Sequence, residues 1–307
     1  MGKIKLVRGG TFAKRVRQLG YLCRHPLNHY RCASLIRRTR MVRGPLTALK
    51  YLGDHLSLSM GATERRDALM GHYAVLPELL RPSVRRNLPK GIQLWQRQLP
   101  SDFPPLSVKL EPSRLAPMEG ELQLTFSFRT HLFVLTFLLA PGHTFGVDAE
   151  TVVFIGGMQG RMGSREEIRE ASKLNGEISP AATLILAMQA FAATAGINDI
   201  IAIDDDDQVS SAYSPLLILF DYRRFWADIG GKRRGRYYRI PIESPSRPLS
   251  EIPITHRRRT RRKREAKSLL RQSFEQRFRE LLTPEAAMTR APAGRMRARP
   301  IPVPAFS

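Results

Sequence analysis

One segment constrains the fold of this chain more than any other: an apolar run at residues 152–155 that ends in closely spaced glycines. Four β-forming residues closed by glycine predict a buried strand that feeds a tight loop. A helical pattern begins soon afterwards, at Arg165. A strand, a glycine loop and a helix in this order can present backbone N–H groups to an anion. The candidate anion-binding residues are Gly156, Gly157, Gly160, Arg161 and Gly163.

The flanking segments predict an α+β fold with a mixed sheet. Apolar and polar residues alternate over 122–128, the pattern of a half-buried strand, and the apolar run 132–139 suits a hairpin partner. Ser179 and Pro180 are typical of a helix start, and Gly196 is typical of its end. Further strands are expected at residues 198–203, 216–220 and 237–242.

The pattern of apolar residues changes several times along the chain, and a proline-rich stretch at 100–117 suggests an extended connector. The sequence therefore predicts five segments. They are a basic N-terminal segment (1–45), a helical region (46–100), an α+β sheet domain (101–255), a basic amphipathic helix (256–282) and a disordered tail (283–307).

The net charge of +23 is concentrated at the two ends of the 307-residue chain. Residues 1–100 carry 20 lysines and arginines against 4 acidic residues, and residues 256–307 carry 15 against 4. Such basic flanks attract polyanions, so anionic membrane lipid and nucleic acid are the candidate partners, and a solvated helix face is the alternative. The candidate lipid- or anion-binding residues are Arg257, Arg258, Arg259, Arg261, Arg262, Lys263 and Arg264.

Cysteine usage and the apolar stretches bear on location. Cys23 and Cys32 are spaced for neither a zinc pair nor a redox pair, which indicates free thiols in a reducing compartment. Basic residues between positions 14 and 17 interrupt any signal-peptide core, and the longest apolar stretch, 181–197, is shorter than the roughly 20 residues of a membrane span. We expect a cytoplasmic chain with no transmembrane segment; an organelle transit peptide is the lesser alternative.

The string 152–160 also carries a resemblance to a known family. Together with residues 168–170 and Lys173, it resembles the central signature of bacterial VirK/YbjX proteins. The resemblance covers residues 45–270 and implies a Gram-negative cytoplasmic protein linked to the cell envelope, to virulence and to resistance against cationic antimicrobial peptides, with no established reaction. Its other matches are Arg66, His72-Tyr73, residues 119–122, Asp221-Tyr222, Phe225-Trp226, Gly230-Gly231 and residues 239–241.

This chain departs from the family pattern at two places. It has Ile178-Ser179-Pro180-Ala181 where the relatives tend to carry Arg-Pro-Lys. It has four consecutive aspartates, 204–207, and then Gln208 where the relatives tend to carry a histidine. We expect any anion binding or proton transfer at those family positions to be weakened or altered here.

The order of elements is similar to the acetyltransferase (GNAT-like) fold, in which loop amides and a helix N-terminus hold the pyrophosphate of acyl-coenzyme A. That similarity implies acyl-CoA as a cofactor at the 156–163 loop. The simpler interpretation, which the glycines alone favour, is that they form a turn and permit close packing.

Two other residue sets are candidate sites. His72 and Tyr73 are the catalytic candidates, although their apolar helical context favours a hydrogen-bonded core pair. The run Asp204–Asp207 offers carboxylates to a divalent cation, but it lacks the glycine and the final glutamate of a calcium loop. A solvated loop is favoured there, and no metal site is predicted.

Three functions remain. The first is a membrane-peripheral accessory protein of the bacterial envelope whose basic flanks bind anionic lipid. The second is an acyl-CoA-dependent acyltransferase that uses the loop 156–163, and the third is nucleic-acid binding by the flanks. An open gap beside the strand that ends at Ile155 would favour a ligand site, whereas a closed sheet would favour a binding module.

Overall fold

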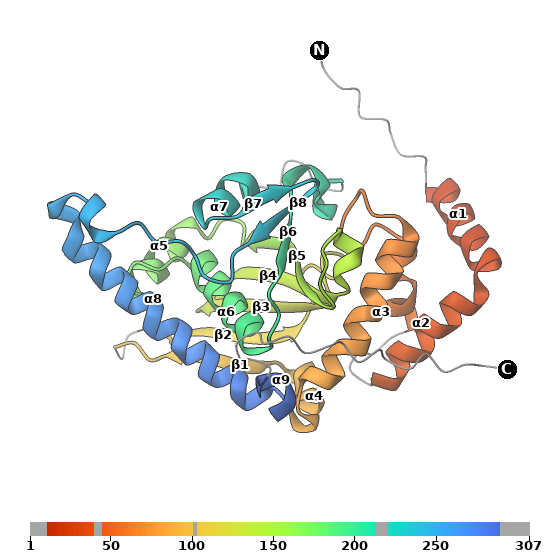
Figure 1. Ribbon diagram of the computed structural model, residues 1–307, viewed down its shortest axis with the longest axis horizontal. Helices are drawn as coiled ribbons and strands as arrows, with labels where there is room; N and C mark the ends of the chain where they lie inside the picture. Colours follow the sequence, from red (N-terminus) through yellow and green to blue (C-terminus); the bar gives the residue numbers. More distant parts are fainter. Residues whose placement is uncertain (1–10, 40–44, 101–102, 213–219, 289–307) are drawn as a thin grey trace, which may run out of the picture.

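An eight-stranded mixed sheet forms the centre of the molecule (Figure 1). The computed structural model describes residues 11–39, 45–100, 103–212 and 220–288. The strand order is β1-β2-β3-β4-β5-β6-β8-β7, and every neighbouring pair is antiparallel except β5 and β6, which run parallel. The strands are β1 Ile92–Arg97, β2 Leu106–Pro112, β3 Leu122–Phe128, β4 Thr130–Ala140, β5 Val152–Gly160, β6 Ile200–Ile203, β7 Lys232–Arg234 and β8 Tyr237–Ile240. The α+β class is confirmed.

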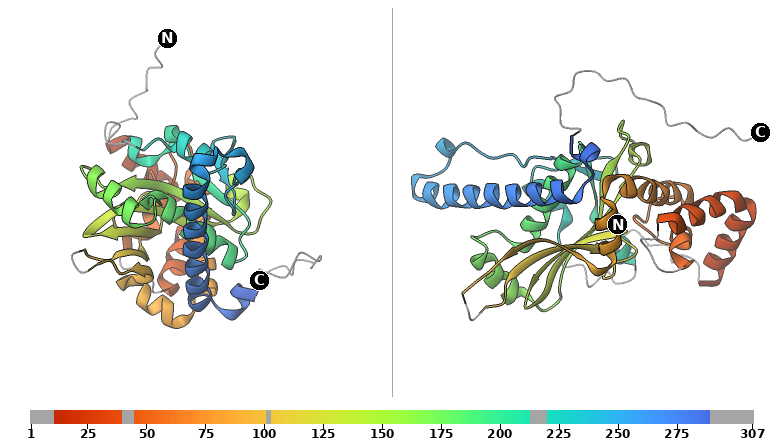
Figure 2. Two further views of the ribbon diagram at one scale, coloured as in Figure 1. Left: turned by 90° about the vertical axis from the view of Figure 1, so that its left-hand side faces the viewer. Right: turned by 90° about the horizontal axis from the view of Figure 1, so that it is seen from below.

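The helices of the described ranges surround this sheet. They are α1 Thr11–Arg24, α2 Pro26–Thr39, α3 Ala62–Leu79, α4 Pro82–Asn87, α5 Arg165–Leu174, α6 Pro180–Thr194, α7 Tyr222–Asp228, α8 Ile254–Leu281 and α9 Pro284–Met288. Helix α6 lies between the sheet and α8 (Figures 1 and 2).

Helix α6 is apolar on all sides because it packs against β3, β4 and β5 and also against α8. The Ser179 hydroxyl accepts a hydrogen bond from the Ala182 N–H at 3.3 Å, and Pro180 occupies the first turn. Gly196 follows with a φ of +69°, a conformation that glycine adopts without strain. The predicted start and end of this helix are confirmed.

Helix α8 buries side chains only in its C-terminal half, at Leu270, Phe274, Phe278 and Leu281. These residues recur at helical spacing and pack toward α6; the rings of Phe278 and Phe191 lie 5.3 Å apart. The N-terminal end of α8 lies at the opposite end of the molecule from α1 and α2 (Figure 1). The arginine-rich first half of α8 is therefore far from α1 and α2, although the two basic flanks meet where the Arg81 N–H donates to the Leu281 carbonyl at 3.0 Å.

The structure corrects several expectations from the sequence. The hairpin of β3 and β4 is confirmed, but β3 is buried on both faces rather than half-buried. Part of the expected connector is strand β2, because its alternating apolar side chains outweigh the flanking prolines. Its partner β1 lies in the region that was expected to be helical. The expected disorder from residue 283 is wrong for α9. Residues 289–307 and most of the expected strand 216–220 lie outside the described residues.

Candidate active site

The sheet is open beside the C-terminal half of β5. Parallel pairing with β6 covers only Val153–Ile155, opposite Ile200–Ala202. Strand β6 ends at Ile203, whereas β5 continues to Gly160 with β4 as its strand partner. A cavity of about 890 Å³ lies against this open part of β5. The tight loop predicted at residue 156 is wrong, since the backbone there remains a strand.

The glycines at 156 and 157 make room for Glu119. Gly156 is the extra residue of a β-bulge, because Thr136 pairs with Gly157 and Phe137 pairs with Ile155. A Cβ on Gly156 would overlap the carbonyl oxygen of Glu119 and lie 2.9 Å from its carbonyl carbon. A Cβ on Gly157 would overlap the Glu119 carboxylate and lie 2.6 Å from its Cδ. These contacts agree with the simpler interpretation, in which the two glycines permit close packing.

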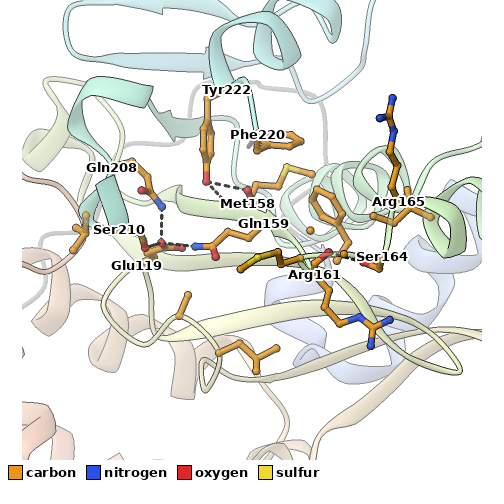
Figure 3. A pocket seen from close by; sticks show the side chains of 18 of the residues that line it. Glu119, Met158, Gln159, Arg161, Ser164, Arg165, Gln208, Ser210, Phe220 and Tyr222 are labelled. Carbon is orange, nitrogen blue, oxygen red and sulfur yellow. Dashed lines mark hydrogen bonds between the residues drawn. The ribbon is translucent and has the colours of Figure 1, made fainter. Parts of the chain in front are cut away.

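Glu119 is a buried carboxyl in the cavity wall, only 1% exposed (Figure 3). Its Oε1 accepts hydrogen bonds from the side-chain amides of Gln159, at 2.6 Å, and Gln208, and from the Ser210 hydroxyl. Its Oε2 accepts from the Thr136 hydroxyl at 3.3 Å. Burial raises the pKa of Glu119 to about 7, against the lowering effect of these donors. The carboxyl is therefore poised to exchange a proton near neutral pH.

Tyr222 and apolar side chains form the middle of the cavity (Figure 3). The Tyr222 hydroxyl donates to the Met158 carbonyl at 2.9 Å and accepts from the Met158 N–H at 2.8 Å. Burial holds the pKa of Tyr222 well above its usual value, so the phenol stays neutral. The apolar lining includes Phe133, Met158, Ile168 and Phe220.

The end of the cavity away from Glu119 is basic (Figure 3). It is lined by the turn between β5 and α5 and by the first residues of α5, where backbone N–H groups and the helix dipole favour an anion. Arg161 forms an ion pair with Glu167, and Arg169 forms one with Glu166. Arg165 is exposed at the same end.

Of the five predicted anion-binding residues, three line the cavity and two do not. Gly160, Arg161 and Gly163 line the cavity, and Gly163 has a φ of +77° in the turn before α5. Gly156 and Gly157 lie behind Glu119 and do not line it. The anion-binding assignment stays a prediction for the first three residues, while the other two position a carboxyl.

His72 and Tyr73 lie in the core on α3, away from the cavity lining. The His72 Nδ1 accepts from the Leu139 N–H at 3.2 Å, and burial lowers the pKa of His72 to about 4. The Tyr73 hydroxyl donates to Glu121, which also pairs with Lys50 Nζ at 2.8 Å. This is the hydrogen-bonded core arrangement that the sequence favours for the two residues.

The aspartate run 204–207 is not a solvated loop, because two of its members are buried. Asp204 pairs with Arg223 at 2.8 Å and with Arg233 at 2.8 Å. Asp207 accepts from the Ser59 N–H at 2.7 Å and from two serine hydroxyls. Within the described ranges, no group of three or more His, Cys, Asp or Glu side chains is placed to share a metal ion.

The arginine cluster of the C-terminal flank lies on the exposed first half of α8. Arg259 pairs with Glu177 at 2.9 Å. Arg257 and Arg264 donate to backbone carbonyl groups. Arg258, Arg261, Arg262 and Lys263 are exposed, and no ion pair joins them to a carboxylate of the described residues. None of the helices in the part of the chain that the structure describes is long and apolar enough to cross a membrane.

Sequence reasoning missed three residues that give the cavity its chemistry: Glu119, Ser210 and Tyr222. It singled out Gln208 only as a departure from the family pattern, and the structure places this side chain on the Glu119 carboxylate. Glu119 and Tyr222 stand within strings that carry the family resemblance, but nothing in their spacing pointed to a site. Ser210 and Glu119 are 91 positions apart and are brought together because η5 (Val209–Ala212) meets the segment that precedes β3. Only the tertiary fold reveals this contact.

Comparison with known proteins identifies the family. The model of the family described as "Protein of unknown function (DUF535)" matches residues 18–276. The chain is 26% identical over 239 residues to the Escherichia coli (strain K12) protein called "Uncharacterized protein YbjX", covering 73% of this chain and 70% of that protein. No solved structure matches. The resemblance to VirK/YbjX proteins is confirmed, and the chain belongs to the DUF535 family.

Proposed function

We propose that the cavity binds a coenzyme A thioester and that the protein transfers the acyl group to a nucleophile. The observation that carries this proposal is the cavity beside β5 where β5 leaves β6, with a basic turn at one end and the Glu119 carboxyl at the other. Clefts with a few converging polar groups and a perturbed pKa are typical of ligand and active sites.

The topology supports this choice of ligand. One parallel pair, β5 and β6, stands in an otherwise antiparallel sheet, and α5 and α6 connect the two strands. This order is similar to the acetyltransferase fold, where the thioester enters between the two parallel strands. The similarity is an analogy of fold, so the chemistry of the cavity has to support the activity by itself.

The cavity offers a position for each part of such a ligand. The turn 161–164, the N-terminus of α5 and Arg165 suit the phosphates. The apolar middle suits the pantetheine arm, which places the thioester toward Glu119. An attacking amine would form a C–N bond with the acyl carbon, the C–S bond would break, and the amine proton would finally reach the departing sulfur.

Calorimetry with coenzyme A and with acetyl-coenzyme A tests the proposal. We expect saturable heat for both ligands and about fivefold weaker binding in Arg165→Gln, because an exposed ion pair, here between Arg165 and a phosphate, contributes up to about 1 kcal/mol. The matched control is Arg258→Gln, on the exposed part of α8, which should leave binding unchanged. No heat from either ligand at millimolar concentration would rule out this function.

A second function, docking on anionic membrane lipid, rests on a separate observation. Arg258, Arg261, Arg262 and Lys263 present an exposed cationic face that the described carboxylates leave unpaired. Each such residue contributes about 1 kcal/mol at an anionic bilayer. The face suits a membrane-peripheral protein, and the family resemblance implied a cytoplasmic protein linked to the cell envelope.

Flotation with vesicles of anionic or zwitterionic lipid tests this docking. Arg261→Gln with Arg262→Gln should weaken binding to anionic vesicles about 30-fold, from the loss of about 2 kcal/mol. Arg224→Gln with Arg234→Gln, two exposed arginines outside both basic flanks, is the control with equal charge change. Equal binding to both lipids would contradict docking, and displacement by duplex DNA with a steep salt dependence would favour nucleic-acid binding instead.

A further inference from the structure

We propose that Ser210 and Glu119 form a proton relay, in which the Ser210 hydroxyl takes the proton of the attacking nucleophile and passes its own proton to Glu119. The identity of the nucleophile, an amine that attacks a thioester, rests on the proposed function. The pairing of the two side chains rests on their own contacts in the structure.

Ser210 is the donor to Glu119 that also meets the requirements of a relay. Among the described donors, Gln159 and Gln208 give amide N–H groups, which cannot release a proton at neutral pH. The Thr136 hydroxyl is buried at 1% exposure. The Ser210 hydroxyl donates to Oε1 of Glu119, and Ser210 lies partly exposed in the cavity lining. A hydroxyl can accept one proton while donating another.

Separate parts of the chain hold Glu119 in place. Gly156 and Gly157 leave the space that its backbone and carboxyl occupy. Gln208 is itself oriented, because its Oε1 accepts from the Ser211 N–H at 3.0 Å. Burial keeps the pKa of the carboxyl near 7, where a proton acceptor is effective at neutral pH. The carboxyl therefore has a fixed geometry and a suitable proton affinity.

The proton balance of the step closes within the site. As the neutral amine forms its C–N bond to the acyl carbon, its N–H proton moves to Ser210 Oγ. The Ser210 proton moves at the same time to Glu119 Oε1, which becomes a carboxylic acid. The C–S bond electrons leave with the sulfur, and the proton returns through Ser210 to that thiolate. The products are an amide and a free thiol, with Ser210 and Glu119 restored.

Kinetics with acetyl-coenzyme A and n-butylamine test the relay in the full chain. With kcat/KM expressed per concentration of neutral amine, we expect it to rise with pH through about 7 in the wild type. Glu119→Gln and Ser210→Ala should each lose about 100-fold or more, since proton transfer by a positioned group contributes typically 10²–10⁴-fold. Glu119→Gln should also lose the rise with pH, and Ser210→Thr should restore activity. The exposed control Glu150→Gln should behave as the wild type.

Infrared difference spectra test the same pair without turnover. A carbonyl band of a buried carboxylic acid should disappear as the pH rises through about 7 and be absent in Glu119→Gln. In Ser210→Ala its midpoint should move to higher pH, because the Ser210 hydrogen bond lowers the pKa of Glu119. An unchanged midpoint in Ser210→Ala, or no band that depends on Glu119, overturns the relay. If the wild type transfers no acetyl group, the acyltransferase proposal fails and the relay loses its nucleophile, whereas the infrared titration still tests whether Ser210 donates to a titrating Glu119 carboxyl.

Discussion

Replacing Gly156 with alanine adds one methyl group at the point where β5 meets Glu119. The added Cβ would overlap the Glu119 carbonyl oxygen and lie 2.9 Å from its carbonyl carbon. Because these atoms belong to the backbone, no rotamer change can relieve the overlap. Either β5 or the segment that carries Glu119 has to move.

The expected cost follows from two opposing terms. Alanine in a strand interior is ordinarily about 0.5–1 kcal/mol more stable than glycine. Overpacking a filled site costs about 1–3 kcal/mol, and the upper value applies where the neighbour is backbone. The net loss in the free energy of unfolding is therefore about 2 kcal/mol. With an entropy of unfolding of about 2.1 cal/mol/K per residue, that loss corresponds to a fall in the melting temperature of about 3 °C for a 307-residue chain.

Thermal unfolding followed by circular dichroism measures this change. The control is Gly53→Ala, whose Cβ would lie 3.6 Å from the Lys50 carbonyl oxygen, an ordinary contact. We expect the control to melt within about 1 °C of the wild type. If Gly156→Ala melts at the wild-type temperature or above it, Gly156 is not required to make room for Glu119.

Three further predictions concern stability. Glu119 has a folded-state pKa of about 7, above the ordinary 4.5, so its stabilising contribution is present below pH 4.5 and lost as the pH rises through 7. In urea unfolding, the wild type should lose about 3 kcal/mol of stability over this pH range and Glu119→Gln should not. If the free energies of unfolding of the two proteins change in parallel with pH, this prediction is wrong. The pKa of Glu121 is lowered to about 2, so its contribution is present above pH 4.5 and lost as the pH falls toward 2. Glu121→Gln should cost about 3 kcal/mol at pH 7, because Lys50 loses its carboxylate, and a cost below 1 kcal/mol refutes this. Ser179→Ala should cost about 1 kcal/mol in the same assay through loss of the α6 cap, and an unchanged free energy of unfolding contradicts this.

The sequence predicted those elements whose signals are local. The cap at Ser179, the proline after it and Gly196 bound α6 correctly, because helix ends are fixed by the residues beside them. The β3–β4 hairpin followed from two apolar runs close together in the chain. These features needed no knowledge of distant contacts.

The site depends on contacts that no local pattern encodes. Glycines after an apolar run predict a loop, yet those at 156 and 157 lie in a bulged strand because Glu119, 37 and 38 positions earlier, occupies the space of their missing side chains. The approach of Ser210 to the same carboxyl spans 91 positions. A sequence shows where side-chain atoms are missing, but not which distant atom fills the gap.

A crystal structure of the protein with bound coenzyme A tests the central claim most directly. We predict density for the pantetheine arm along residues 158–160 of β5, with the phosphates at the turn 161–164 and the sulfur directed toward Glu119. Density elsewhere on the molecule, or an unoccupied cavity at millimolar coenzyme A, would contradict the claim that the open edge of β5 is the active site.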